Sequence, residues 1–94
     1  MKNDYSAAKK MRTSVTIRVA GRLFEGHLSY VNQMVESASE CGLWPLLGLA
    51  QVEEVDRAVI QYLIDGDNRE FGLEDCPGFV RKWMEHERAR VAAA

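Results

Sequence analysis

Two different hydrophobic periods divide this chain. From residue 13 to residue 19, apolar and polar residues alternate, which is the period of two expected for a strand with one buried face. Gly21 and Arg22 interrupt the alternation, and a shorter extended pattern resumes over residues 23–28. Because glycine readily adopts the positive φ of a tight connection, this pattern predicts a β-hairpin over residues 13–28. Residues 20–28 are also compatible with the start of a helix.

Beyond Ser29 the apolar residues recur at intervals of three and four. The first such stretch predicts an amphipathic helix that begins at Ser29 and ends at Gly42. The second predicts a helix from Gln51 to Ile64, with an apolar stripe formed by Val52, Val55, Val59, Ile60 and Leu63. A last helix is expected to begin near Asp75 or Cys76, with an inner face made of Phe79, Val80, Trp83 and Met84 and a solvated end over residues 85–90.

The segment Leu43–Leu49 between the first two predicted helices is unusual. Five of its seven residues are large and apolar, whereas Pro45 and Gly48 argue against a regular helix. We therefore expect a connector, either buried in the core or exposed. Burial is favoured because large exposed apolar patches are uncommon on soluble proteins.

Together these elements predict an α+β fold: a small single domain with an N-terminal β-hairpin packed against two to three α-helices. Residues 1–12 are expected to be a basic arm or short helix, and residues 13–94 one globular domain. The chain has 94 residues, 47% hydrophobic and 28% charged, as in ordinary globular proteins. No apolar run approaches the ~18 residues of a membrane span, and no signal peptide is recognisable. We expect a cytoplasmic protein with Cys41 and Cys76 reduced.

The charge is unevenly distributed along the sequence. The net charge is −2, but residues 1–22 carry +5, residues 23–79 carry −9 and residues 80–94 carry +2. Such segregation favours association steered by charge, with a basic partner for the acidic segment.

No pattern typical of an active site or a metal site is present. His27 and His86 lack partners at zinc-binding spacing. The run that begins at Asp65 and Asp67 fails the calcium-loop pattern in both registers, because Arg69 falls on a ligand position in each. Cys76 has no evident general base. We therefore expect neither an enzyme nor a cofactor or metal.

One function that remains is DNA binding. The segment Thr13–Val19 resembles the strand of ribbon-helix-helix repressors, and residues 54–63 are similar to the second helix of that family. The resemblance implies an intertwined dimer in which Ser14, Thr16 and Arg18 read the DNA bases.

The function that we place first is a non-enzymatic protein-binding module. Small single-domain proteins without catalytic motifs include the inhibitors that phages and mobile elements direct against host defence complexes such as CRISPR effectors. The expected partner is a basic protein complex, including one that binds nucleic acid. Tryptophan is frequent among binding hot spots, and carboxylates would meet the basic surface. The predicted partner-binding residues are Trp44, Glu53, Glu54, Asp65, Asp67, Glu70, Glu74 and Asp75.

Overall fold

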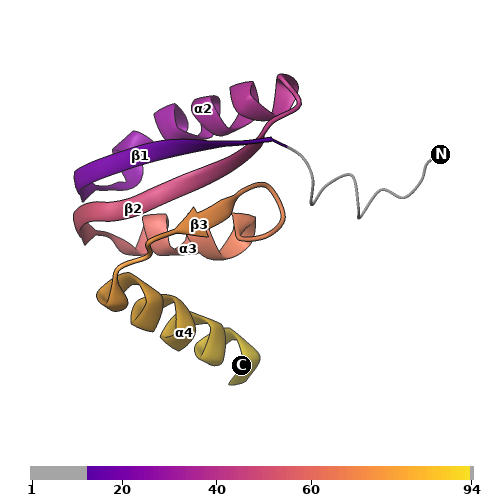
Figure 1. The fold of residues 1–94 in the computed structure, drawn as a ribbon. Helices are drawn as coiled ribbons and strands as arrows, with labels where there is room; N and C mark the ends of the chain where they lie inside the picture. The colour runs from indigo at the N-terminus through magenta and orange to yellow at the C-terminus, as the bar shows by residue number, and fades with distance from the viewer. Residues whose placement is uncertain (1–12, 94) are drawn as a thin grey trace.

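The segment that the sequence analysis assigns to a hairpin is one continuous strand. In the computed structural model, which describes residues 13–93, β1 extends over Ser14–Leu23 and pairs in parallel with β2 (Trp44–Val55) (Figure 1). The predicted basic arm, residues 1–12, and Ala94 lie outside the described residues. The short helix η1 (Glu25–His27) and the α-helix α2 (Leu28–Glu40) follow β1 directly. The hairpin prediction is therefore wrong, whereas the first strand is confirmed.

Gly21 explains the error. Its φ is +74°, so the prediction of a left-handed backbone is confirmed. However, the glycine lies next to a shift in the register between β1 and β2, not in a turn. A bulge uses the same positive φ as a tight turn and lets the strand continue. The sequence alone does not distinguish these two uses of glycine.

The apolar segment Leu43–Leu49 is mostly strand. Pro45, Leu47 and Leu49 are buried on one side of β2, so the favoured alternative of burial is confirmed. Two register shifts give β2 two more residues than the facing part of β1. As a result, the buried residues in the second half of β2 are three apart: Leu49, Val52 and Val55. This spacing imitates a helix, and the predicted helix start at Gln51 is wrong for that reason.

Helix α3 (Arg57–Gly66) begins where β2 ends. Asp56 is its N-cap, since one carboxylate oxygen accepts a hydrogen bond from the backbone N–H of Val59 at 3.1 Å. The other oxygen accepts one from the N–H of Glu25 at 2.9 Å and thereby ties η1 to the helix start. The third strand, β3 (Gly72–Glu74), and the last helix, α4 (Gly78–Ala93), complete the domain. A small α+β domain is thus what the structure shows.

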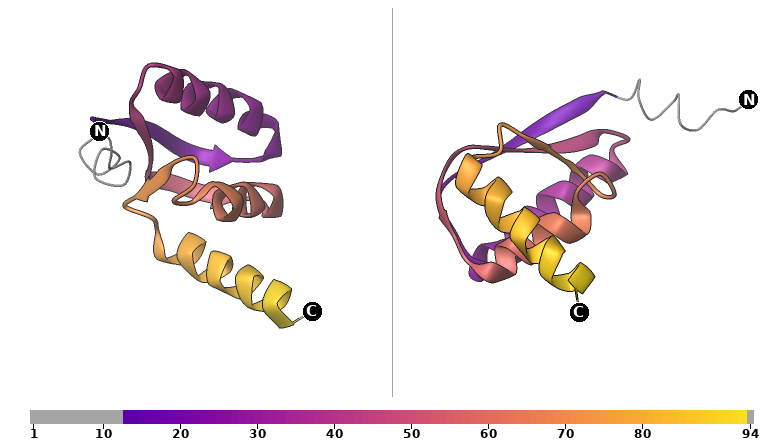
Figure 2. Two further views of the ribbon diagram at one scale, coloured as in Figure 1. Left: turned by 90° about the vertical axis from the view of Figure 1, so that its right-hand side faces the viewer. Right: turned by 90° about the horizontal axis from the view of Figure 1, so that it is seen from below.

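The sheet is parallel, with the strand order β1-β2-β3. Crossovers between parallel strands are almost always right-handed, so two crossovers that advance in the same direction place α2 and α3 on the same face. Figure 2 shows the strands on one side of the molecule and the helices on the other. We call the side that α2 and α3 cover the covered face.

The core lies between the covered face and the helices. Its buried members come from β1, β2, all three long helices and the segment before β3, and they include Leu23, Val31, Val35, Leu47, Leu49, Val59, Ile60, Leu63, Phe71, Val80 and Met84. Phe71, which precedes β3, lies against Gly66 and stacks on Tyr62 with 5.4 Å between the ring centroids. Within residues 13–93, no helix is long and apolar enough to cross a membrane.

Candidate functional site

Within residues 13–93, no helix covers the other side of the sheet, which we call the open face (Figure 2). It presents mostly small or polar residues: Thr16, Arg18 and Ala20 of β1, Gly48 and Ala50 of β2, and Gly72 and Glu74 of β3. A Cβ placed on Gly48 would point at Thr16 and Arg18, which confirms that these residues share one face. Thr16 donates a hydrogen bond of 3.1 Å to the carboxylate of Glu74, across β2. The open face therefore has its own polar contacts but no layer above it.

A cleft of about 530 Å³ lies at the edge of this face, between β3 and α4. We call it the β3–α4 cleft. Its strand side includes Trp44, Leu46, Gly72, Leu73 and Asp75, and its helix side includes Arg81, Met84, Glu85 and Arg88. Each of these four helix residues is three or four positions from two of the others, so they form one side of α4.

Gly72 creates part of this cleft because it has no side chain. A Cβ there would lie 2.8 Å from Cδ2 of Leu46 and 3.2 Å from Nε1 of Trp44. The two larger side chains of β2 therefore lie over the glycine and form an apolar wall. Only glycine permits this arrangement without a shift of Leu46.

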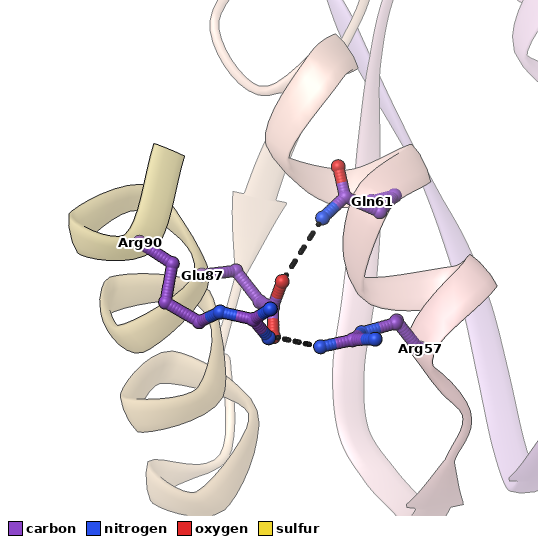
Figure 3. A network of polar contacts seen from close by, with 4 residues as sticks. All are labelled: Arg57, Gln61, Glu87 and Arg90. Atoms are coloured by element: carbon purple, nitrogen blue, oxygen red, sulfur yellow. Dashed lines mark hydrogen bonds and ion pairs between the residues drawn. The ribbon is translucent and has the colours of Figure 1, made fainter. Parts of the chain in front are cut away.

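The other wall is fixed in place because α4 attaches to α3 through a buried carboxylate (Figure 3). Glu87 is only 5% exposed and accepts hydrogen bonds from Arg57 at 3.2 Å, from Gln61 at 3.3 Å and from Arg90 at 3.3 Å. Burial opposes ionisation of Glu87. The hydrogen bond and charge of Arg57, the charge of Arg90 and a hydrogen bond from Trp83 outweigh burial and lower the Glu87 pKa.

This network corrects the prediction for α4. The sequence pattern predicts a solvated helix end over residues 85–90, but Glu87 is buried there. Of the predicted inner face, Val80 and Met84 are buried and Trp83 is half-buried, whereas Phe79 is 45% exposed. An acidic residue between charged neighbours carries no sequence signal of burial, so the network depends on the approach of α3.

The charges of the cleft are only partly neutralised. Arg88 and Asp67 form an ion pair at 3.3 Å. Among the residues that the structure describes, neither Asp75 nor Glu85 forms an ion pair. The cleft thus has two carboxylates without a cationic partner.

The half-buried thiol of Cys76 also lines the cleft. Burial raises the Cys76 pKa, and the negative charge of Asp67 adds to this effect. The charge and hydrogen bond of Arg81 oppose it without cancelling it. Since a raised pKa disfavours the thiolate, this cysteine is poorly suited to act as a nucleophile.

The structure brings some of the predicted partner-binding residues together and separates others. Trp44, Asp67 and Asp75 line the β3–α4 cleft. Glu74 and Asp75 border a second hollow of about 310 Å³ on the open face, beside Arg18.

The remaining predicted residues lie elsewhere. Glu53 and Glu54 are in the last part of β2, well past the residues that pair with β3, and Glu54 forms an ion pair with Arg22 at 3.4 Å. Asp65 borders a hollow between α3 and α4, and Glu70 lies in the turn before β3. The acidic segment thus does not form one continuous surface.

The residues of the DNA-binding alternative lie on β1. Its strand pairs in parallel with β2 of the same chain, whereas the resemblance to ribbon-helix-helix proteins implies pairing with a second copy. In addition, the element that follows α2 is the strand β2, which extends to Val55. The resemblance implies instead that a second helix comes directly after the first. The fold implied by that resemblance is therefore absent from residues 13–93. Of the predicted reading residues, Ser14 and Arg18 are exposed, and Thr16 is hydrogen-bonded to Glu74.

The residues on the helix side of the cleft were not predicted from the sequence. Arg81, Glu85 and Arg88 repeat at helical spacing, but nothing in that pattern indicates that a sheet edge lies opposite. In the described part of the chain, no group of three or more His, Cys, Asp or Glu residues is placed to hold a metal ion. A comparison of the chain with models of known protein families, with curated proteins and with solved structures finds no match in any of the three.

Proposed function

We propose that this chain is a non-enzymatic protein-binding module that binds a basic protein through the β3–α4 cleft. The observation that carries the proposal is the presence of two carboxylates without ion pairs, Asp75 and Glu85, in the cleft that Trp44 and Leu46 wall. Arg81 and Arg88 also line the cleft, so its three carboxylates exceed its guanidinium groups by one charge. An apolar wall beside an excess of unpaired carboxylates is typical of sites that select an oppositely charged protein segment.

The charges favour a lysine or arginine from the partner. A cation between Asp75 and Glu85 would gain attraction without displacing an existing ion pair. The Arg88–Asp67 pair nearby is about half exposed on the arginine side, and surface pairs of this kind contribute only about 0–1 kcal/mol. A partner cation can therefore also exchange with Arg88 at little cost.

Trp44 supplies the apolar part of the site. It is half-buried beside Leu46, so part of the indole remains available for contact. Buried tryptophans at the centre of an interface commonly account for 2 kcal/mol or more of binding free energy, roughly a thirtyfold change in affinity. The partner expected from the sequence is a basic protein complex, including one that binds nucleic acid, and complexes that bind nucleic acid carry the basic surfaces that such a site requires.

The test is a selection from a phage-displayed library of random 12-residue peptides on the immobilised protein. We expect enrichment of peptides that contain lysine or arginine and that bind more weakly as salt rises. The double variant Asp75→Lys/Glu85→Lys should lower their affinity at least about tenfold. The matched control Glu25→Lys/Glu40→Lys makes the same charge change at exposed residues outside the cleft and should alter affinity less than about twofold.

Two results would overturn the proposal. One is the absence of enriched basic peptides, and the other is an equal effect of the two double variants. Salt-sensitive binding of the protein to duplex DNA, lost in Arg18→Ala, would instead support the DNA-binding alternative.

A further inference from the structure

We infer that the partner segment is an extended basic peptide that adds to β3 as a fourth strand, an inference that rests on the proposed function. The sheet ends at β3, so one edge of this strand has no neighbouring strand within the described residues. In a parallel strand, alternate residues direct both their N–H and C=O groups to the neighbour and the others direct them outward. The outward backbone groups of β3 can therefore pair with an incoming strand.

The structure leaves these outward groups without another backbone partner. Within the described residues, no backbone hydrogen bond joins Gly72, Leu73 or Glu74 to any segment other than β2. The cleft lies beside them, since Gly72, Leu73 and Asp75 line it together with one side of α4. An incoming strand would thus find hydrogen-bonding groups on one side and a helix on the other.

The lining also suits the alternation of side chains along a strand. Successive side chains of an added strand would point in turn to the two sides of the sheet. On the open face they would meet Trp44 and Leu46, and on the opposite side they would meet Met84 of α4. In this mode of recognition, the backbone provides affinity and the alternate pockets provide specificity.

Charge selects β3 over the other edge of the sheet. The opposite edge is β1. Its exposed Arg18 has no ion pair among the described residues and would repel a basic peptide, whereas Arg22 is paired with Glu54. The β3 edge has beside it the carboxylates Asp75 and Glu85, which are unpaired within residues 13–93. Of the two arginines there, Arg88 is paired with Asp67 and Arg81 is hydrogen-bonded to Cys76. The two bulges, whose extra residues lie in β2, increase the local twist of the β1–β2 pair and further disfavour the addition of a regular strand to β1.

The test uses a basic peptide obtained from the selection described above, synthesised with one backbone nitrogen methylated at a time. Strand addition predicts that methylation lowers affinity at least about tenfold at every second position of the bound segment and much less between them. In amide exchange measured by NMR, alternate amides of residues 72–75 should become protected when the peptide is bound, whereas the amides of β1 should not change.

The outcomes separate the inference from the proposed function. If methylation shows no alternation but Asp75→Lys/Glu85→Lys still abolishes binding, strand addition is excluded and the proposed function stands. If the charge variant has no effect on peptide affinity, both fail. Protection of β1 amides in place of β3 amides would show that the peptide adds to the wrong edge, and it would overturn the inference.

Discussion

The two faces of the sheet place different kinds of residue on the same three strands. On the covered face, Leu47 and Leu49 are each 1% exposed and pack with the helices. On the open face, the residues of β2 that alternate with these leucines are Leu46, which is half-buried, and Gly48. Parallel sheets are normally covered on both faces, so a bare face is unusual for this topology. The comparison indicates that the covered face contributes most of the buried core, and that within residues 13–93 the open face is left for the binding that we propose.

Neighbouring leucines provide the sharpest test of this difference. Leu47→Ala removes a fully buried side chain and should lower the free energy of unfolding by about 2–5 kcal/mol. Leu46→Ala, one residue earlier on the open face, should cost about 1 kcal/mol or less and should weaken peptide binding instead. Urea unfolding of both variants measures the contrast, and equal losses of stability would contradict the assignment of the faces.

Two glycines test the same contrast by adding a methyl group. In Gly66→Ala the new Cβ would overlap the ring of buried Phe71, so we expect a loss of about 1–3 kcal/mol. In Gly48→Ala the nearest atom is Cγ2 of Thr16 at 3.1 Å, on the open face where that side chain can move. The second variant should change the free energy of unfolding by less than about 1 kcal/mol. Thermal unfolding of the two variants measures this difference. A greater loss of stability in Gly48→Ala than in Gly66→Ala would contradict the assignment of the two glycines to different environments.

The attachment of α4 on the helix side of the sheet should depend on pH. The pKa of Glu87 is lowered from its ordinary value of 4.5 in the folded protein, so the unfolded chain takes up the proton first as pH falls. The stability that the Glu87 carboxylate contributes is present above pH 4.5 and is lost as pH falls through the lower folded pKa. The difference in free energy of unfolding between wild type and Glu87→Gln should therefore shrink between about pH 6 and about pH 3.

Glu85→Gln is the control for this titration. Glu85 lies on the same helix but has no ion pair among the described residues. A constant difference between wild type and Glu87→Gln over the whole pH range would show that Arg57 and Arg90 do not stabilise the carboxylate.

The smallest effect on stability is expected at the cleft itself. Asp75 and Glu85 are exposed and form no ion pair within residues 13–93, so Asp75→Lys/Glu85→Lys should change the free energy of unfolding by no more than about 1 kcal/mol in total. Most of this loss is expected at Asp75, because its φ of +53° suits Asp better than Lys. The same variant should abolish most of the peptide binding. A large loss of stability would mean that these carboxylates maintain the fold, and binding data for the variant would then require a folded control.

The sequence predicted the parts of the fold that depend on local pattern. The first strand, the helix after residue 28 and most of residues 57–66 follow from apolar periods that match a single element. The strand over residues 44–55 was missed for two reasons: Pro45 and Gly48 resemble breakers, and the bulges space Leu49, Val52 and Val55 like a helix. The bulges exist only because β2 pairs with β1, and a local sequence pattern contains no information about that pairing.

The candidate site divides in the same way. The sequence identified Trp44, Asp67 and Asp75 from their residue types, because aromatic and acidic residues suit a basic partner. It did not identify Gly72 or Glu85, which matter only because β3 and α4 lie side by side. It also grouped Glu53 and Glu54 with residues near the opposite end of the sheet.

By itself, the sequence determined the composition of the core, the mixture of strand and helix, and the acidic character of residues 53–75. These are properties of residue type and local period, which each segment carries wherever it lies. Only the tertiary structure decided that the strands are parallel, that α2 and α3 share one face, and that Glu87 is buried. Each of these depends on the order in which distant segments pack, and the cleft beside β3 exists because that packing leaves one strand edge without a partner.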